Sequence, residues 1–387
     1  MNIAFHYYAI KAVAAFAGLP DREAQIIAEY SQFIDDYSTR DTIYTNWAPQ
    51  DLVEAGVVKK KADRKFEIPL ITTGFVSMWE TAQLVSSDFR NRMLIPFHFI
   101  LPRRMVPENF TQVVEQAGIN DNQIISELLR RVCQNVQTAP QRSQRDLQLM
   151  YLGMVLHTFC DTYAHQGFSG HRQDSNGYKI TRVLRQAETS LSDVTAQYSS
   201  AGFVPYHKFP NIGHCTVGHV PDDTYLNFRL EKPDHGTYER SNLLAFIDLC
   251  GILFPLFQRC SGNPVPSFED IRLKLRSAFM LDNDATARLA PEWTRIFADE
   301  AISFHYDREE ILLRLAPGLR RYNNEEALAN NTFCQEETAK IAKKMLSPDQ
   351  AATSLSTYWA DVTPEFFTFT MWAYQMRRRA VDDQYLD

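Results

Sequence analysis

The feature that most constrains this chain is a series of three polar side chains, four residues apart, inside an apolar segment. His157, Asp161 and His165 lie within residues 141–165, where many neighbours are leucine, methionine, valine or phenylalanine. Residues four apart share one face of an α-helix, so the three side chains are expected to point the same way. The apolar neighbours predict a deeply buried helix.

Two interpretations fit this helix. Burying histidine and aspartate is costly unless they are paired or bound to a metal. A His–Asp–His ladder held by hydrogen bonds is the structural interpretation. A metal site is the functional one, because imidazole nitrogens and carboxylate oxygens are zinc ligands. Spacing and burial together favour the metal. Gly153, one turn before His157, leaves room for another backbone or a ligand to approach.

Further candidate ligands precede this helix. His6 lies on the first predicted helix, and Asp35 and Asp36 end the second. Acidic residues at a helix C-terminus oppose the helix dipole, and a bound cation would offset this placement. A solvated pair that closes the helix is the alternative. His98 lies between two prolines in an apolar segment that is expected to be extended. Taken alone, His6 and His98 favour core histidines.

Two segments after the long helix are rich in polar residues. Residues 166–178 form a predicted polar loop, and loops beside a rigid ligand helix often carry substrate contacts. Residues 199–236 form the longest predicted irregular stretch, and such loops in compact domains are usually functional. Within ten residues this stretch carries a candidate ligand cluster, for which a surface turn is the alternative: His214, His219, Asp222 and Asp223.

Composition limits the class of protein. The 387 residues can bury a large core, and 45% apolar with 22% charged residues is typical of a soluble globular protein. The net charge of −7 argues against a protein that coats nucleic acid. It allows a nuclease, whose metals supply local positive charge. The six cysteines contain no CxxC pair and are expected to be free thiols in a reducing compartment.

The sequence predicts no targeting signal and no membrane-spanning segment. The first residues lack a basic region followed by a long apolar core, so no signal peptide is expected. This predicts a cytoplasmic protein and leaves open export by a signal-independent route. No apolar run is judged to approach the roughly 18 residues that span a bilayer, so no integral membrane segment is expected.

The patterns predict an all-α fold. Helical periodicity covers most of the chain, including residues 180–198 and the region after residue 237, and no strand series or repeat is evident. We expect a multi-helix domain over residues 1–315 around the metal site. Additional C-terminal helices over residues 316–387 are expected to pack on it.

The order of the candidates resembles the zinc-dependent phospholipase C and single-strand nuclease superfamily, whose members are all-α enzymes with zinc ions. A closer resemblance is to uncharacterised bacterial proteins with a DFHYY-like N-terminal segment, a DD helix end, an IPFHF segment and a DxxAHQGFSG helix end. The matching pieces here are residues 4–8, 34–36, 95–99 and 161–170. This second resemblance covers roughly residues 1–310.

The resemblance implies a metal-dependent hydrolase of a phosphate ester, with a metal-activated water as nucleophile. It implies about one to three Zn²⁺ ions, other divalent metals being possible. Asp161 would bridge two ions between His157 and His165, and Asp35 would also orient the water, so these carboxylates are the catalytic candidates. The implied ligands are His6, Asp35, His98, His157, Asp161, His165, His214, His219 and Asp222.

The same resemblance makes His171 and Arg172 candidates for phosphate contacts, with lipid favoured over nucleic acid as substrate. The chain departs from the superfamily at the last ligand pair, where position 218 is Gly, so Asp222, Asp223 or His219 must serve. Met1 stands where the superfamily has an N-terminal Trp. The alternative function is a non-catalytic, metal-stabilised helical protein that acts through a protein partner. A catalytic zinc keeps an open coordination position and a structural zinc does not, so the openness of the metal site distinguishes the two functions.

Overall fold

The structure, a computed structural model, describes residues 2–37, 42–61, 64–69, 73–74, 87, 90–102, 113–199, 210–263, 267–281, 286–321 and 358–385. The chain divides into two compact units. The first unit contains residues 1–34, 94–306 and 379–387, and the second contains residues 35–93 and 307–378.

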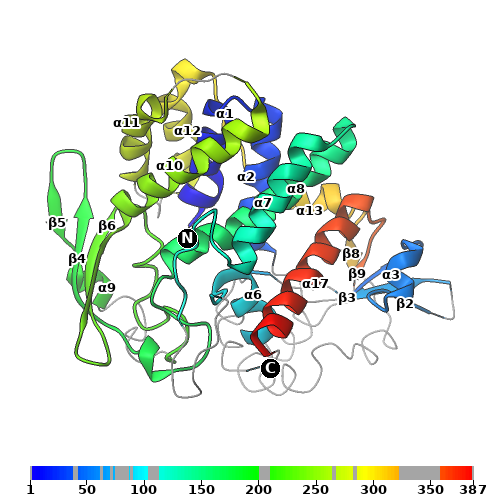
Figure 1. The fold of residues 1–387 in the computed structure, drawn as a ribbon, viewed down its shortest axis with the longest axis horizontal. Helices are drawn as coiled ribbons and strands as arrows, with labels where there is room; N and C mark the ends of the chain where they lie inside the picture. The colour runs from blue at the N-terminus through cyan, green and yellow to red at the C-terminus, as the bar shows by residue number, and fades with distance from the viewer. Residues whose placement is uncertain are drawn as a thin grey trace. The chain divides into compact units, whose positions relative to one another are not determined.

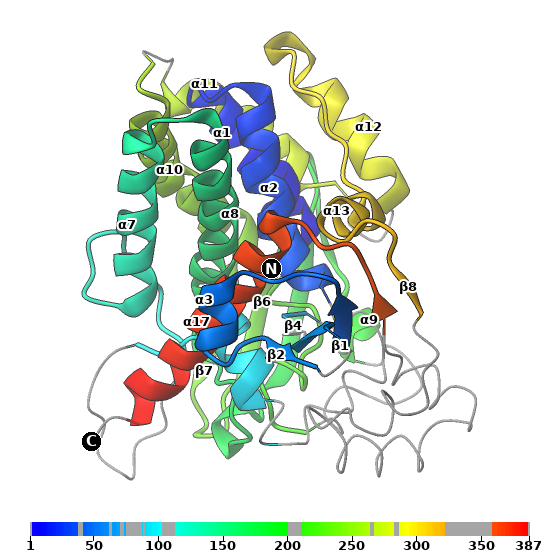
Figure 2. The same cartoon turned by 90° about the vertical axis from the view of Figure 1, so that its right-hand side faces the viewer.

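The first unit is built around the long helix α8 (Arg142–Ala164), which confirms the helix predicted over residues 141–165. Every residue from Leu152 to Ala164 is buried. Helices α7 and α2 lie on either side of α8 (Figures 1 and 2). The other helices are η1 (Ala4–Ala9), α1 (Ile10–Phe16), α2 (Asp21–Asp36), α6 (Ile95–His98), α7 (Ile124–Thr138), η4 (Asp174–Asn176), α9 (Thr195–Ser199), α10 (Asn242–Ser261), α11 (Phe268–Phe279), α12 (Thr286–Ile296) and η6 (Ala298–Glu300).

Helices α8 and α2 approach each other closely at Gly153. A Cβ atom added there would lie 2.3 Å from the carbonyl oxygen of Ile27. Any larger residue would therefore push α2 away. The room predicted beside Gly153 is filled by the backbone of α2, and one turn further along α2 the carbonyl of Ser31 reaches His157.

A four-stranded antiparallel sheet, in the order β5-β4-β6-β7, completes the first unit (Figure 1). Residues on one face of β6 are buried, and they alternate with polar residues. These buried residues are Leu226, Phe228 and Leu230. The strands are β4 (Lys179–Gln186), β5 (Leu191–Asp193), β6 (Leu226–Glu231) and β7 (Thr237–Ser241).

The all-α prediction is therefore wrong, because the protein is mixed α/β. Residues 180–198, which were predicted to be helical, form most of β4, then β5 and α9. Residues 226–241 form β6 and β7, although 199–236 was predicted to be irregular. The alternation along β6 was a strand signal. Only Val183 of β4 is buried, so pairing with β6 decides the conformation of this strand more than any local pattern.

The second unit holds a five-stranded sheet in the order β2-β3-β1-β9-β8. Strands β1 and β9 run parallel, and the other pairs are antiparallel. Strands after residue 316 thus share one sheet with strands from residues 42–69. The elements are β1 (Thr42–Thr45), α3 (Gln50–Glu54), β2 (Lys59–Lys60), β3 (Phe66–Pro69), α13 (Arg308–Leu315), β8 (Arg320–Arg321), β9 (Tyr358–Trp359) and most of α17 (Pro364–Tyr385).

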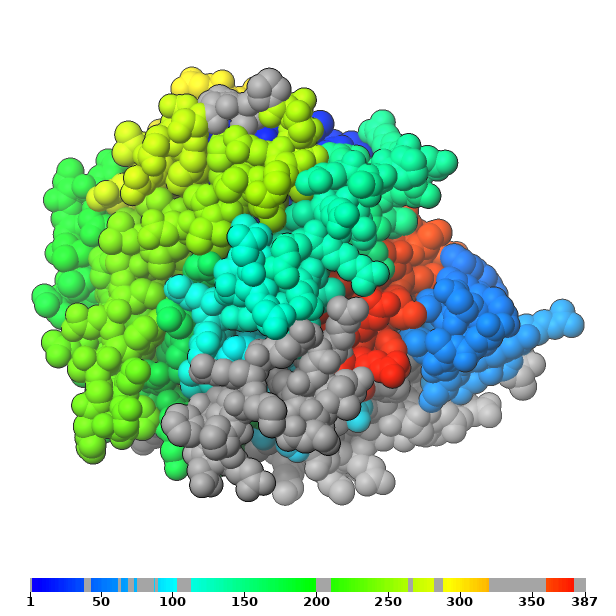
Figure 3. Space-filling model, in the orientation of Figure 1, coloured from blue at the N-terminus to red at the C-terminus, as the bar shows by residue number. Residues whose placement is uncertain are grey.

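Helix α10 is long and apolar enough to cross a membrane by length and composition, contrary to the expectation that no run approaches that length. Of its most apolar window, 56% is buried inside the protein. Its other side, which includes the exposed Leu244, forms part of the surface of the first unit (Figure 3). A core helix passes the same test, so this finding alone is weak evidence for a membrane segment.

The cysteines that the structure describes are free thiols, as predicted: Cys133, Cys160, Cys215, Cys250 and Cys260. Cys334 lies outside the described residues.

Candidate metal centre

Among the described residues, three groups of histidines and aspartates can each hold a metal ion. Within each group, one ligand atom of every member lies within 4.8 Å of the others. We call them the N-terminal group (His6, Asp35 and His157), the central group (His98, His157 and Asp161) and the C-terminal group (His165, His214 and Asp222).

Two of the histidines come from unusual helical turns. His6 lies in the π-helical η1, and His98 ends α6, which directly follows the π-helical η3 (Arg90–Leu94). The π-helix is rare and occurs frequently at functional sites. The prediction of an extended segment around His98 is wrong. Pro96 occupies the first turn of α6, where a missing N–H costs no intrahelical hydrogen bond.

Asp161 lies at the middle of the helix-borne ligands. Its Oδ1 is 3.1 Å from His6 Nε2, and its Oδ2 is 3.0 Å from His98 Nδ1 and 3.3 Å from His157 Nε2. Ligands of one tetrahedral zinc, at roughly 2.0–2.1 Å from the ion, are about 3.3 Å apart. The two carboxylate oxygens therefore face different imidazoles at ligand spacing, which is the arrangement of a bridging carboxylate.

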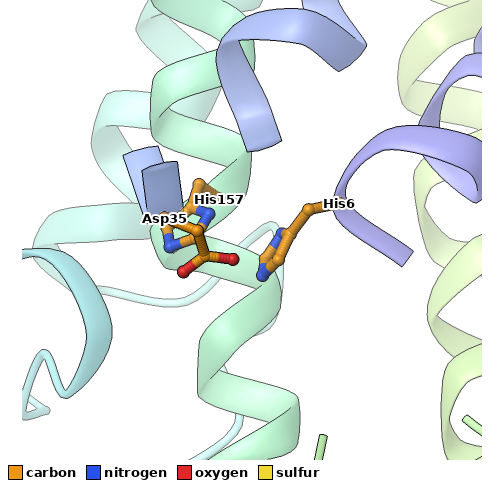
Figure 4. Close-up of side chains that lie close together, drawn as sticks. All are labelled: His6, Asp35 and His157. Carbon is orange, nitrogen blue, oxygen red and sulfur yellow. The ribbon is translucent and has the colours of Figure 1, made fainter. Parts of the chain in front are cut away.

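Asp35 joins His6 and His157 in the N-terminal group (Figure 4). The division between the two units falls after Ile34, but α2 continues unbroken to Asp36, so Asp35 stays on the same helix. In Figure 4 the carboxylate of Asp35 points toward the two rings. Asp35 is half-exposed, whereas His6 and His157 are buried. Asp36, the alternative, is in none of the three groups.

Backbone carbonyl groups fix the tautomers of three histidines. The Nδ1 atoms of His157, His165 and His214 lie 2.8, 2.7 and 2.7 Å from the carbonyl oxygens of Ser31, His98 and Gly218. A carbonyl oxygen only accepts, so each Nδ1–H donates to it. In a neutral ring, Nε2 then carries the lone pair, as in a histidine prepared for a metal.

These Nε2 lone pairs face carboxylate oxygens. The distances are 3.3 Å from His157 to Asp161 Oδ2, 3.2 Å from His165 to Asp222 Oδ1, and 3.3 Å from His214 to Asp222 Oδ2. Burial lowers the pKa of both His157 and His214 to about 4, so these rings are neutral near pH 7. Two acceptors at this distance repel each other unless a cation or a donor lies between them, and for His157 and Asp161 the nearby His98 Nδ1, 3.2 Å and 3.0 Å away, is one such donor. A metal ion meets that requirement.

The carboxylates of these groups are ionised. Burial by itself would raise the pKa of Asp161 and of Asp222. Surrounding positive charge outweighs burial and holds the pKa of both carboxyls well below the usual value. For Asp161 this charge includes that of His157, and for Asp222 that of His214, because these rings become charged as the pH falls to about 4, where the carboxyls would begin to bind protons. The groups thus combine neutral imidazoles with carboxylates, the donor set that suits Zn²⁺.

The structure distinguishes among the candidates near Asp222. Asp222 belongs to the C-terminal group. Asp223 is buried, but its two carboxylate oxygens accept hydrogen bonds from Asn2 Nδ2 and the Tyr198 hydroxyl, each at 3.2 Å. His219 has a side chain that is 79% exposed, and its Nδ1 is 3.9 Å from Asp222 Oδ2, so it lies at the edge of the group.

Asp161 does not serve His157 and His165 in the way expected. His165 Nδ1 is 3.8 Å from Asp161 Oδ2 and bonds the carbonyl of His98, while its Nε2 faces Asp222. The reason is that α8 ends at Ala164, and His165 leaves helical geometry at φ −92° and ψ 12°. The third ligand of the series is thereby turned to a different group.

The two loop candidates are not members of the three groups. Arg172 is exposed, and its backbone pairs with Ile212. His171 is half-exposed, and neither residue is a member of a group. Met1, the candidate N-terminal ligand, lies outside the described residues.

Sequence reasoning missed the residues that orient the ligands. Phe99 stacks on His165 with ring centroids 4.4 Å apart. Gly213, at φ +52°, lies so close to this ring that a Cβ atom would be 2.7 Å from Phe99 Cζ. The position of Phe99 beside His98 was a usable signal. The carbonyl of Ser31 carried none, because any residue type supplies one.

The fold and these groups define a mixed α/β protein with buried histidine–aspartate groups that can bind metal ions. The chain belongs to a family of unknown function, DUF6765, whose model matches residues 1–376. Searches of curated proteins and of solved structures give no match.

Proposed function

We propose that the protein is a metal-dependent hydrolase of a phosphate ester, with Zn²⁺ as the metal and a metal-activated water as the nucleophile. The observation that carries the proposal is the placement of three imidazole Nε2 atoms 3.2–3.3 Å from carboxylate oxygens. This spacing matches that between ligands of one zinc ion, about 3.3 Å. The phosphate-ester chemistry itself is supported by the resemblance to the phospholipase C and nuclease superfamily.

The residues have different roles in this proposal. Bound Zn²⁺ would supply a Lewis acid and lower the pKa of a bound water. Asp161 would present its two oxygens to different imidazoles and so join the N-terminal and central groups. Asp35 is half-exposed beside two buried histidines, which makes it the carboxylate that an incoming water can reach. We assign it the orientation of that water.

A non-catalytic metal protein is the second candidate, and one observation favours it. His98, His157 and Asp161 are all buried, and a closed group is typical of a structural metal. Catalytic sites keep an open position, and the half-exposed Asp35 and His214 supply openings at the other two groups. His157 belongs to both the N-terminal and the central group but has one free nitrogen, Nε2, so it can bind an ion in only one of them. We therefore place catalysis at the N-terminal and C-terminal groups, and the second candidate places a structural ion in the central group.

The class of substrate is predicted from the net charge of the protein. The net charge of −7 disfavours long polyanions, so a lipid phosphodiester is preferred to nucleic acid. Arg172, exposed beyond the end of α8, keeps its predicted role as a phosphate contact, and so does His171.

The test begins with elemental analysis of the purified, untagged protein and continues with hydrolysis assays. We expect bound zinc and cleavage of bis(p-nitrophenyl) phosphate and of phosphatidylcholine vesicles, with single-stranded DNA cleaved more slowly. Bound metal without hydrolysis of any of the three would support the second candidate. Absence of metal after reconstitution with Zn²⁺ would remove both.

A further inference from the structure

Arg240 connects the two chain segments that carry the C-terminal group. It lies in β7, opposite Phe228 of β6. Its guanidinium is 5.4 Å from the ring centroid of Phe228 and 5.6 Å from that of Phe246. The two aromatic rings hold the planar cation in one place.

The hydrogen bonds of Arg240 end beside the metal ligands. Its Nη1 donates to the carbonyl oxygens of Tyr163 and Ala164, the latter at 3.1 Å, and its Nη2 donates to that of Pro221 at 2.7 Å. Ala164 immediately precedes His165, and Pro221 immediately precedes Asp222. The guanidinium of Arg240 is a rigid fork of N–H donors, and it therefore sets the separation of His165 and Asp222, whose Nε2 and Oδ1 atoms are 3.2 Å apart.

Asn242 extends this fork around Asp222. Its side-chain oxygen accepts from Arg240 Nε at 2.7 Å. Its amide nitrogen donates to the carbonyl oxygens of Val220 and Asp223, each at 2.8 Å. The carbonyls on both sides of Asp222 are thus fixed by one arginine–asparagine pair, and Asn242 is itself buried.

The position of Arg240 also has an electrostatic logic. Tyr163 and Ala164 are the last residues of α8, where free carbonyls carry the negative end of the helix dipole. Within the described part of the chain, the hydrogen-bond partners of this guanidinium are backbone carbonyls, the Asn242 amide and the Tyr238 hydroxyl. The cation thus caps the helix and leaves the carboxylate of Asp222 available to a metal.

We infer that Arg240 is the positioning residue of the C-terminal group: it assembles that metal site by fixing the end of α8 against the turn that carries Asp222. The inference rests on the proposed metal binding, and it applies to the C-terminal group and not to the central group. The ligands of the central group lie on α6 and α8 and receive no hydrogen bond from Arg240.

The test compares metal affinities in Arg240→Met with those of the wild type. Removal of a residue that orients metal ligands typically costs about 10- to 100-fold in metal affinity. We expect one Zn²⁺ equivalent to weaken by about this factor in chelator-competition titrations, while the other equivalents keep their affinity. The Co²⁺-substituted variant should show the same missing absorption component as His214→Gln, which lacks a ligand of that group.

Two further variants serve as checks. Arg240→Lys keeps the charge but lacks the fork, so it should weaken the same equivalent to a smaller extent, and it remains informative if Arg240→Met does not fold. Arg185→Met is the matched control, because Arg185 is a half-buried arginine of the same sheet that lies over Tyr225. It should bind metal like the wild type.

The possible results separate the inference from the proposed function. Wild-type affinity for every equivalent in a folded Arg240 variant would overturn the inference and leave the proposed function standing. Equal weakening of all equivalents would also overturn it, since Arg240 would then act on the whole fold. A wild-type protein without any metal would overturn both.

Discussion

The carboxylate of Asp161 lies within 3.3 Å of three imidazole nitrogens. Only one of these rings, that of His157, is on the same helix. Because His157 already donates its Nδ1 proton to Ser31, the carboxylate receives a lone pair from that ring, not a hydrogen bond. Without a cation, this pair depends on the proton of His98 Nδ1, which lies 3.2 Å from His157 Nε2 and 3.0 Å from Asp161 Oδ2, so single residues are decisive.

Asp161→Asn tests this directly. The variant should lose the Zn²⁺ ion that His157 and Asp161 would hold and lose any hydrolytic activity, because a neutral amide is a poor zinc ligand. Without metal it should be at least as stable as metal-free wild type, since the new amide can donate to the His157 lone pair. Urea denaturation and elemental analysis measure both effects.

If His157, Asp161 and His165 instead form a hydrogen-bonded ladder without a metal, the opposite result is expected for this variant. Breaking a buried ion pair by removing one partner costs about 3–5 kcal/mol, and that loss would appear in metal-free Asp161→Asn. Asp248→Asn, a change at an exposed position on α10, is the control and should behave like wild type. A fully metallated Asp161→Asn protein would contradict the assignment of Asp161.

The stability of the metal-free protein should fall as the pH drops from 6.5 to about 4. The pKa of His157 and of His214 is lowered from 6.5 to about 4 in the folded state, mainly by burial. The unfolded chain binds more protons in this interval, so the stabilisation present above pH 6.5 is lost progressively below it. Each ring accounts for about 3 kcal/mol.

Urea titrations at several pH values measure this slope. Asp223 opposes it in part, because burial raises its pKa to about 6 and the folded state then binds an extra proton within this interval. The raised pKa of His219 acts above pH 6.5. His235→Asn, at an exposed left-handed turn position, should leave the slope unchanged. A free energy of unfolding that is flat or increases toward pH 4 would show that the buried rings are already charged.

At the scale of elements, the contact between α2 and α8 aligns the ligands. Gly153 permits the backbone of α2 to approach so closely that the Ser31 carbonyl reaches His157 Nδ1 at 2.8 Å. The same helix carries Asp35, so the contact also sets the N-terminal group. The sheet acts similarly on the other side of α8, because β7 supplies Arg240 to the end of that helix.

Gly153→Ala should therefore separate these two helices. Its Cβ would lie 2.3 Å from Ile27 O, and overpacking of this kind typically costs about 1–3 kcal/mol. We also expect weaker binding of the zinc ion held by His157. Gly251→Ala in α10 is the matched control and should be about neutral, since the gain in helix propensity offsets a small shift of the Phe268 ring.

The free energy of unfolding and the zinc affinity are measured for both variants. A Gly153→Ala protein as stable as wild type, with unchanged zinc affinity, would show that α2 can move without disturbing His157.

At the scale of the whole molecule, the ligands come from segments that span positions 6 to 222, all carried by or continuous with the first unit. A metal bound by such ligands closes several long loops of the chain. Metal binding is therefore expected to contribute to folding as well as to chemistry.

Removal of the metal with a chelator should lower the melting temperature, and added Zn²⁺ should restore it. A ligand present at a hundred times its Kd stabilises the folded state by about 2.7 kcal/mol. Differential scanning calorimetry before and after chelation measures the change, and Mg²⁺ serves as the control ion. An unchanged melting temperature in protein shown to have bound zinc would contradict a structural contribution.

The sequence by itself determined the features that depend on local pattern. Four-residue spacing in an apolar run predicted the buried helix α8 and its ligands His157 and Asp161, and the second predicted helix, with Asp35 near its end, is α2. Gly153 was recognised as a point of close approach. These predictions succeed because helix periodicity and steric size act within a few residues.

Only the tertiary structure decided the rest. Strand β4 is extended because it pairs with β6, some forty residues away, so its own pattern was misleading. The choice of Asp222 over Asp223 depends on Asn2 and Tyr198, which engage the second carboxylate. The role of Arg240 depends on carbonyls that any sequence would supply. Such choices are made by contacts distant in the chain, which local periodicity does not encode.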